Sequence, residues 1–125
     1  MPYRLEWNNK TALVIFDGIM SRQGLRDVGN AFYGDSRLDA LECLIADFNN
    51  ADLSQLTFDD INTIASIDSA TVMYKPKLKM AFVTSDHSVR EVLKKYIDTS
   101  ETLSSTWNYS VFNKYEDARN WCELD

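Results

Sequence analysis

Residues 111–125, VFNKYEDARNWCELD, combine a short apolar strand with a tryptophan-bearing helix that follows almost at once. Within the helical part, Ala118, Trp121 and Cys122 fall on one face, at spacings of three and four residues. A face that buries a tryptophan contributes a few kcal/mol of apolar burial. The stretch therefore predicts a final helix that packs on a sheet as a structural layer.

The rest of the chain alternates apolar strands with amphipathic helices. Strands are predicted at residues 2–8, 11–18, 41–48, 78–85 and 107–113, and helices at 22–34, 57–74, 87–98 and from 114 onward. The near-continuous apolar run at 41–48 is typical of a strand that is covered on both faces. The turn-like NNK at 8–10 makes the first two strands an antiparallel hairpin. The resulting order, β-β-α-β-α-β-α-β-α, predicts an α/β fold with a mostly parallel sheet and helical cover.

Capping signals mark three of the predicted helix starts. Ser21 is placed to cap the first helix. Thr57 and Asp60 have the spacing of a capping box at the start of the second helix. Asn113 has the equivalent position before the last helix, with Glu116 three residues later.

Composition and charge exclude some classes of partner. The 125 residues are 45% apolar and 26% charged, which is typical of one globular domain spanning residues 1–125. The net charge of −6 argues against a nucleic-acid backbone or an anionic membrane, because both repel an acidic surface. No apolar run approaches the roughly 20 residues that span a bilayer, and the first ten residues lack the apolar centre of a signal peptide. We therefore expect a cytoplasmic domain with no nucleic-acid partner and no membrane span.

The cysteines and the histidine exclude several kinds of chemistry. Cys43 and Cys122 are too few for a disulfide framework and lack the spacing of a metal site. We therefore expect two reduced cysteines that behave as small buried apolar residues. His87 is the only histidine, which argues against a histidine-rich zinc or iron centre. The sequence predicts no metal and no cofactor.

Four stretches carry a resemblance to a known family. They are LIADFNNADLS at 44–54, IASIDSA at 64–70, YKPKLKMAFVTSD at 74–86 and, above all, VFNKYEDARNW at 111–121. With these stretches the chain resembles the SpoIIAA-like fold, specifically the small STAS/SEC14-like bacterial proteins related to anti-sigma-factor antagonists. None of the four is a catalytic signature. The resemblance therefore implies a fold and a non-enzymatic regulatory role.

For the antagonists, the resemblance implies a phosphorylation switch. A partner kinase modifies a serine at the start of the helix that follows the central strand. Their Asp-Ser-Ser-Gly element should lie near residues 52–58, where this chain has DLSQLTF. Ser54 or Thr57 can stand in for that serine, because a helix N-terminus favours negative charge. The alternative, which we favour, is that Thr57 is an ordinary N-cap and Ser54 a polar loop residue.

A further constellation lies at or just beyond the carboxyl ends of predicted strands, where ligands gather in open α/β sheets. The set mimics a phosphoryl-accepting receiver domain and consists of Asp17, Asp47, Thr84 and Lys114. However, a receiver has a pair of acids after its first strand, and here Asp17 is followed by Gly18. A receiver also places an additional strand-helix unit between its acids. We therefore favour the interpretation that these polar residues simply end buried strands.

The candidate surface for a partner or ligand consists of Asp47, Asp68, Ser85, Asp86 and His87. His87 lies at a helix start, where we expect a neighbouring serine or aspartate to cap the helix and the backbone amides can hold a small anion. Asp68 lies on or beside the apolar stripe of the second helix. The resemblance includes Asp68 as a carboxylate for a partner or ligand, whereas we favour a flank position with the carboxylate in water.

Two functions from different classes are consistent with these observations. The leading hypothesis is a cytoplasmic, non-enzymatic regulatory domain that docks a protein partner through segments near 49–58 and 84–88. The alternative, implied by the SEC14-related branch, is a carrier of a small apolar or lipid-like ligand. A cavity between the sheet and the helices at 57–74 and 87–98 favours the carrier, and a filled core with an exposed apolar patch favours docking. The sequence leaves homodimerisation open.

Overall fold

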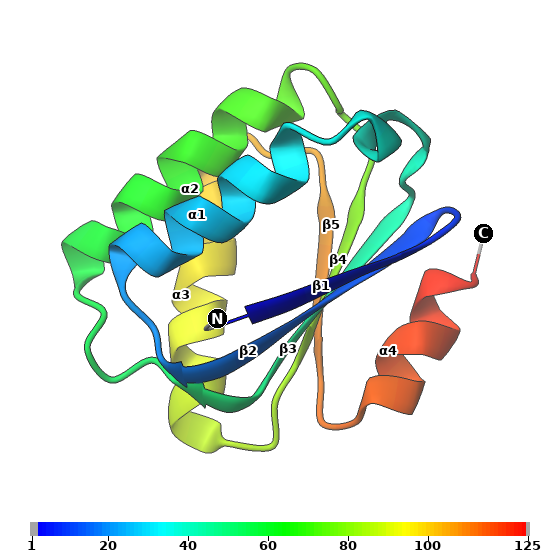
Figure 1. Cartoon of the computed structure of the whole chain (residues 1–125). Helices are drawn as coiled ribbons and strands as arrows, with labels where there is room; N and C mark the ends of the chain where they lie inside the picture. The colour runs from blue at the N-terminus through cyan, green and yellow to red at the C-terminus, as the bar shows by residue number, and fades with distance from the viewer. Residues whose placement is uncertain (1–2, 125) are drawn as a thin grey trace.

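The computed structural model describes residues 3–124 (Figure 1), so Pro2 of the predicted first strand lies outside the described residues. The elements in chain order are β1 (Tyr3–Asn8), β2 (Thr11–Ile19), α1 (Arg22–Tyr33), the short 3-10 helix η1 (Ser36–Ala40), β3 (Cys43–Asp52), α2 (Phe58–Val72), β4 (Lys79–Val83), α3 (His87–Thr102), β5 (Asn108–Phe112) and α4 (Tyr115–Cys122). Within the described residues the strands form one sheet in the order β1-β2-β3-β4-β5. β1 and β2 are antiparallel, and the other neighbouring pairs are parallel. The predicted α/β fold class is confirmed.

The opening hairpin has a two-residue turn. Asn8 pairs with Thr11, which leaves Asn9 and Lys10 between the strands. Asn9 has a positive φ of 57°, a left-handed conformation that asparagine tolerates better than most residues. The turn therefore lies in the NNK stretch, as predicted.

The sheet separates two helical layers (Figure 1). α1, α2 and α3 cover one face, and α4 covers the other. Along β3, Leu44, Ala46 and Phe48 belong to the core under the three helices, and Ile45 belongs to the core under α4, as the period of a strand requires. Burial on both faces confirms the prediction for this strand. No helix between residues 3 and 124 has the length and apolar character of a membrane span.

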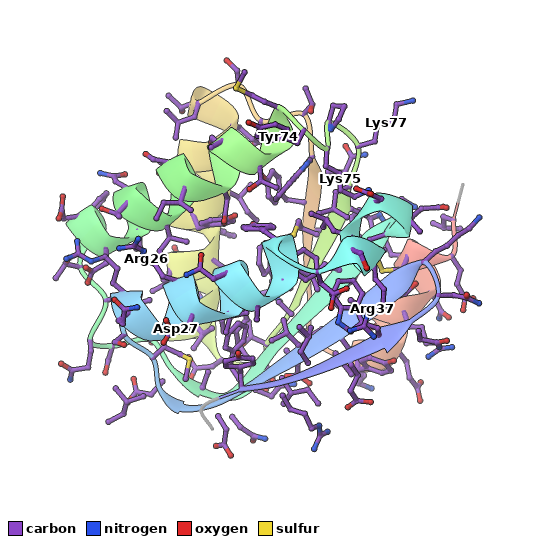
Figure 2. All side chains as sticks on the ribbon, turned by 45° about the horizontal axis from the view of Figure 1, so that its top comes forward. Arg26, Asp27, Arg37, Tyr74, Lys75 and Lys77 are labelled. Carbon is purple, nitrogen blue, oxygen red and sulfur yellow. A yellow bond between two sulfur atoms is a disulfide. The ribbon has the colours of Figure 1, made fainter. Side chains whose placement is uncertain are left out.

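α1 shows how the three-helix layer is built. Leu25, Val28 and Phe32, three or four residues apart, pack against the core. Arg26 and Asp27 are exposed on the same helix (Figure 2). The apolar stripe thus faces the sheet and the charged residues face solvent.

Two of the three predicted helix caps are confirmed. The Ser21 hydroxyl accepts a hydrogen bond of 3.0 Å from the Gly24 N–H at the start of α1. At the start of α2, the Asp60 N–H donates to Thr57 Oγ1 at 3.1 Å, and the Thr57 N–H donates to Asp60 Oδ2 at 2.9 Å. Thr57 and Asp60 therefore form a complete capping box.

The predicted cap of the last helix is wrong. The residue before α4 is Lys114, which makes no side-chain capping bond. Asn113 lies one residue before the cap position, and its side-chain oxygen accepts a bond of 2.6 Å from the Arg90 guanidinium. Glu116 and Asp117 instead bring negative charge to the first turn, where the helix dipole favours it.

α4 packs on the sheet through the face that the sequence predicts. Ala118 is fully buried, and the Trp121 ring lies 5.6 Å from the Phe112 ring, centroid to centroid. The Lys79 ammonium donates to the backbone carbonyls of Trp121, at 3.0 Å, and of Leu124. A cation therefore sits at the carboxyl end of the helix, which stabilises that end.

The expectation of two separate, reduced cysteines is wrong. Cys43, at the start of β3, and Cys122, at the end of α4, form a disulfide with their Cα atoms 5.6 Å apart. A Cα separation of this size is typical of disulfides. The two residues are 79 positions apart in the sequence, and they meet because α4 packs across the sheet beside β3.

β3 continues four residues beyond its predicted end. A register shift between Ile15 and Asp17 marks a β-bulge in the pairing of β2 with β3. Beyond the bulge the two strands stay paired as far as Ile19 and Asp52. The polar residues at 49–52, which the sequence assigns to a loop, therefore belong to the end of the strand.

Candidate functional site

A cavity of about 120 Å³ lies between the sheet and the three-helix layer. Its lining comes from β1 to β4, from α1, α2 and α3, and from the segment before α2, and it is almost wholly apolar. The polar members of the lining are Tyr33, Asp60, Asp68 and Tyr96. No lysine, arginine or histidine of the described residues lines it. The cavity lies where the sequence analysis expects one for a carrier.

The sheet supplies an aromatic floor for this cavity. Phe16, Phe48 and Phe82 come from three neighbouring strands and face the same layer. The Phe16 and Phe48 rings stack with centroids 4.6 Å apart, and the Phe48 and Phe82 centroids are 6.1 Å apart. Ala46 in β3 and Gly29 in α1 have the smallest side chains of the lining. Ala46 lies on the same face of β3 as Leu44 and Phe48, so a larger side chain there would enter the layer above the floor.

One polar cluster joins the three helices at the cavity wall. This tyrosine–aspartate cluster consists of Tyr33 from α1, Asp68 from α2 and Tyr96 from α3. The Tyr33 hydroxyl donates to Asp68 Oδ1 at 2.7 Å, and the Tyr96 hydroxyl donates to Asp68 Oδ2 at 2.5 Å. The interpretation of Asp68 as a flank residue with its carboxylate in water is wrong, because both oxygens accept hydrogen bonds inside the fold.

Burial governs the protonation of the cluster. Burial raises the pKa of Asp68 above its usual 3.8, and the hydrogen bonds from Tyr96 and Tyr33 oppose that rise. Burial also raises the pKa of Tyr33 and of Tyr96 well above 10.0, and the negative charge of Asp68 adds to both shifts. The tyrosines therefore stay protonated and act as donors, and Asp68 is the member whose charge changes as the solution is acidified.

Two of the predicted surface residues, Asp47 and Ser85, are connected by hydrogen bonds of Asn49, which is not among the predicted site residues. The Asn49 side-chain oxygen accepts hydrogen bonds from the Ser85 N–H at 2.9 Å and from the Ser85 hydroxyl at 3.3 Å. The Asn49 N–H donates to Asp47 Oδ1 at 2.9 Å. These bonds fasten the end of β3 to the segment after β4. Asp68 shares no hydrogen bond with this edge in the described part of the chain.

Asp86 and His87 have separate roles at the start of α3. Asp86 Oδ1 accepts hydrogen bonds from the Ser88 and Val89 N–H groups at 2.7 and 3.1 Å, so the aspartate is the cap. The His87 side chain is 85% exposed, with its Nε2 3.6 Å from a Glu91 carboxylate oxygen. Two of the first amides of α3 are therefore satisfied by Asp86 and are not directed at solvent.

The two candidate switch hydroxyls differ in their surroundings. Thr57 Oγ1 is occupied in the capping box by the N–H of Asp60, so Thr57 is an N-cap, as expected. Ser54 is exposed, and its N–H donates to Asp52 Oδ1 at 2.8 Å. Hydrogen bonds from Ser54 lower the pKa of Asp52, and the bond from the Thr57 N–H lowers the pKa of Asp60. Next to each candidate hydroxyl, an aspartate with a lowered pKa thus accepts a hydrogen bond from the backbone, Asp52 from Ser54 and Asp60 from Thr57.

Thr84 and Lys114 of the receiver-like set lie just beyond the ends of β4 and β5. Thr84 is fully buried, and its hydroxyl accepts a bond of 3.1 Å from the Asp86 N–H. Lys114 is the residue that precedes α4. Residues 3–124 contain no group of three or more histidine, cysteine, aspartate or glutamate side chains placed to hold a metal ion. Thr84 and Lys114 thus occupy structural positions at the ends of strands.

Large apolar side chains are exposed near the carboxyl ends of β2 and β3. Ile19 ends β2 and is 66% exposed, and Phe58 begins α2 and is 58% exposed. The Lys95 ammonium lies 3.4 Å from the centroid of the Phe58 ring, within range of a cation–π interaction. Both residues continue apolar patterns of their elements, Ile19 after Leu13 and Ile15 in β2 and Phe58 before Ile61 in α2, so the sequence does not distinguish them from core residues. Tyr74, just beyond the other end of α2, is 90% exposed (Figure 2).

The element order, the sheet order and the two helical layers define a SpoIIAA-like, STAS-type α/β fold. Among solved structures, the chain is similar to the anti-sigma factor antagonist SpoIIAA in its unphosphorylated form, with a TM-score of 0.61. The match covers 94% of this chain and 94% of that chain, at 8% sequence identity. A likeness at this identity concerns the fold, and it confirms the fold that the sequence resemblance implies. No family model and no curated protein matches the sequence.

Proposed function

We propose that the chain is a non-enzymatic binding domain that holds a small, largely apolar ligand in the cavity. The cavity between α1, α2, α3 and the sheet is the observation that supports this function. An apolar cavity of about 150 Å³ stays dry and binds benzene. The 120 Å³ of this cavity therefore suits a small ring or a branched chain of about five carbon atoms.

Binding without catalysis fits the chemistry of the cavity wall. General acid–base catalysis needs a group that releases or takes a proton near a reacting atom. Tyr33 and Tyr96 have raised pKa values and donate to Asp68, which holds their protons in place. His87 lies at the surface and does not line the cavity. These features support a holding role for the site.

An NMR titration with toluene tests the ligand-binding function. The wild-type chain should show saturable shifts at the backbone amides that surround the cavity. Two variants fill the cavity from different elements, Val28→Phe in α1 and Ala46→Leu in β3, and both should lose saturable binding. The control Ala70→Leu makes the same alanine-to-leucine change at an exposed position of α2. It should bind toluene as the wild type does.

Two results contradict this function. One is the absence of saturable shifts in the wild type up to the solubility limit of toluene. The other is toluene binding by Val28→Phe and Ala46→Leu that equals binding by the wild type. Thermal unfolding of each variant shows that the compared chains are folded.

A second candidate function is the docking of a protein partner, which the exposure of Ile19 and Phe58 favours. Phe58 belongs to the 49–58 segment, and the hydrogen bonds of Asn49 fasten this segment to Ser85. The similar solved protein is an anti-sigma factor antagonist. From that likeness we infer a regulatory role for this chain, carried out through the edge that bears Phe58.

Crosslinking from native lysate, with mass spectrometry of the crosslinked peptides, tests docking. Phe58→Ser removes the exposed aromatic ring at the start of α2, and Tyr74→Ser removes one beyond its other end as a matched control. A docked partner should crosslink to residues 49–58 or 84–88 in the wild type and in Tyr74→Ser, and should be lost in Phe58→Ser. Equal crosslinking by all three chains contradicts this edge. Light scattering of the purified chain shows whether the partner is a second copy.

We also propose that Ser54, rather than Thr57, is the site if docking is regulated by phosphorylation. The Thr57 hydroxyl already caps α2, whereas Ser54 is exposed in the loop before that helix. Incubation with native kinase extract should add one phosphate to the wild type and to Thr57→Ala, but none to Ser54→Ala. An unchanged intact mass of the wild type contradicts the switch.

A cytoplasmic location is part of this proposal. Disulfides are rare in the reducing cytoplasm, so the proposal requires that Cys43 and Cys122 are thiols in the cell and form their disulfide on oxidation. Acid quenching of cells, followed by alkylation in denaturant and mass spectrometry, should find both cysteines modified; the denaturant exposes Cys43, which is buried in the fold. Unmodified, disulfide-bonded cysteines from freshly trapped cells contradict a cytoplasmic location.

A further inference from the structure

Asp68 is a carboxylate without a cationic partner. It lines an otherwise apolar cavity, and none of the ion pairs formed among the described residues includes it. Its hydrogen bonds come from two neutral hydroxyls. Asp68 is partly buried, and desolvation of a charge without an ionic partner is costly even when it is incomplete.

The groups that face Asp68 from the surrounding elements do not supply that cation. Tyr33 in α1 and Tyr96 in α3 are neutral donors, and Tyr109 in β5 is a neutral phenol whose pKa the charge of Asp68 raises further. The other carboxylate of the lining, Asp60, is already paired, with its Oδ1 3.6 Å from the Arg22 guanidinium. Among the described residues no side chain supplies a positive charge to Asp68, so the site is open to a cationic group of a ligand.

We propose that the cavity takes a small primary amine, with its ammonium group against Asp68 and its apolar part over the aromatic floor. This inference rests on the ligand-binding function proposed above and names its chemical class. An ammonium group has three N–H donors and no acceptor. The cluster offers a matching set of acceptors, because the Asp68 oxygens keep free lone pairs and each tyrosine oxygen can accept as well as donate.

Size and charge select the ligand together. The 120 Å³ cavity has room for an apolar group of about five carbon atoms beside the cluster. A zwitterion or a carboxylic acid would bring a second negative charge next to Asp68 and Asp60, and the lining has no cation to receive it. A neutral alcohol or hydrocarbon of the same shape lacks the charge that pairs with Asp68. An amine with one apolar branch meets all these conditions.

Calorimetric titration with three probes of one shape tests the proposal. The probes are 3-methylbutylamine, 3-methylbutan-1-ol and 2-methylpentane, titrated into the wild-type chain at neutral pH. The amine should bind at least about tenfold more tightly than the alcohol and the hydrocarbon, as expected for a charge-assisted contact. Its affinity should fall as the pH is lowered through the pKa of Asp68, while the affinity of the other two stays constant.

Three variants separate charge recognition from a loss of folding. Asp68→Asn keeps the shape and the acceptor oxygen but removes the charge, so it should lose the preference for the amine and keep the alcohol within about twofold. Tyr33→Phe removes one hydroxyl and should weaken amine binding by a smaller factor. Asp27→Asn removes an exposed carboxylate of α1 that does not line the cavity, and it should leave the preference for the amine unchanged.

The outcomes distinguish this inference from the function on which it rests. If the alcohol and the hydrocarbon bind and the amine does not, the amine proposal is overturned and the ligand-binding function stands. If Asp68→Asn prefers the amine as strongly as the wild type does, recognition by Asp68 is overturned. If none of the probes binds and toluene does not bind either, both proposals fail.

Discussion

The two faces of the sheet are packed in opposite ways. Under α4, Ala81, Val83 and Ala118 are fully buried at the centre of the contact, with the Phe112 and Trp121 rings beside them. The Cys43–Cys122 disulfide fastens the end of the helix to β3. Under α1, α2 and α3, three phenylalanines form a floor, and a cavity of about 120 Å³ remains above it.

The comparison shows that one sheet can carry a helix fastened by a disulfide on one face and a helical layer with an apolar cavity on the other. Close packing around Ala81, Val83 and Ala118 gives the centre of the α4 face stability and order. The space on that face, about 160 Å³, is a partly polar groove between α4 and the β1–β2 hairpin. The other face retains a cavity and a carboxylate held by two hydroxyls, and both features cost stability compared with a filled apolar core. The space on the second face is almost wholly apolar, as the ligand proposed above requires.

The largest expected effect comes from the disulfide on the α4 face. It closes a loop of 79 residues, and loss of such a crosslink is expected to lower the free energy of unfolding by about 4 kcal/mol. Urea unfolding with and without a reductant measures this effect. The Cys43→Ser/Cys122→Ser double variant should show the lower stability in both conditions. A wild type that is insensitive to reductant contradicts a fastening role for the disulfide.

The next effect comes from the Trp121 side chain on the same face. Trp121→Ala removes the ring that packs on Phe112 and lies 5.3 Å from the Lys79 ammonium. We expect a loss of about 3 kcal/mol in the free energy of unfolding, at the lower end for a tryptophan because the ring is partly exposed. A loss below about 1 kcal/mol in a denaturant titration would mean that α4 is peripheral and that the contrast between the faces is weaker.

The smallest expected effect is a pH dependence of the free energy of unfolding, caused by Asp68 on the cavity face. Its pKa in the fold is raised above the 3.8 of an exposed carboxyl, so the folded state holds the proton more tightly than the unfolded state does. Its contribution to stability is therefore present below pH 3.8 and is lost as the pH rises through the pKa in the fold. Asp68→Asn lacks this loss.

Comparison of the two chains isolates the contribution of Asp68. The pKa values of Asp35, Asp52 and Asp60 are lowered. Their contribution to the free energy of unfolding is therefore lost in the opposite direction, as the pH falls. These carboxylates are the same in both chains. The unfolding free energy of Asp68→Asn minus that of the wild type should therefore increase as the pH rises through the window. A difference that does not change with pH would place Asp68 in a solvent-like environment.

The order of elements could be predicted because the signals for it are local. The spacing of apolar residues, the NNK turn and the Thr57–Asp60 capping box each act within a few residues of the chain. Asn113 shows the limit of such reasoning. The sequence pattern places the cap at Asn113, but α4 begins at Tyr115, so Lys114 holds the cap position, and the Asn113 side-chain oxygen accepts a bond from Arg90 of another helix.

The candidate site could not be predicted in full because its partners come from distant segments. Asp68 was recognised as a candidate, but Tyr33 and Tyr96 lie 35 and 28 residues away along the chain. The available signal was an aspartate beside an apolar stripe, together with hydroxyl-bearing aromatic residues at the apolar faces of two other helices. The disulfide was missed for the same reason, because only the packing of α4 brings its cysteines together.

The most direct test of the contrast between the faces is one substitution made on each side of the sheet. Ala46 in β3 lines the cavity, and Ala81 in the neighbouring β4 is fully buried under α4. Urea unfolding of Ala46→Leu and Ala81→Leu measures how much volume each face can accept. We expect Ala81→Leu to lose about 1–3 kcal/mol of unfolding free energy from overpacking, and Ala46→Leu to change by less than about 1 kcal/mol. Equal losses, or a larger loss in Ala46→Leu, would contradict the account.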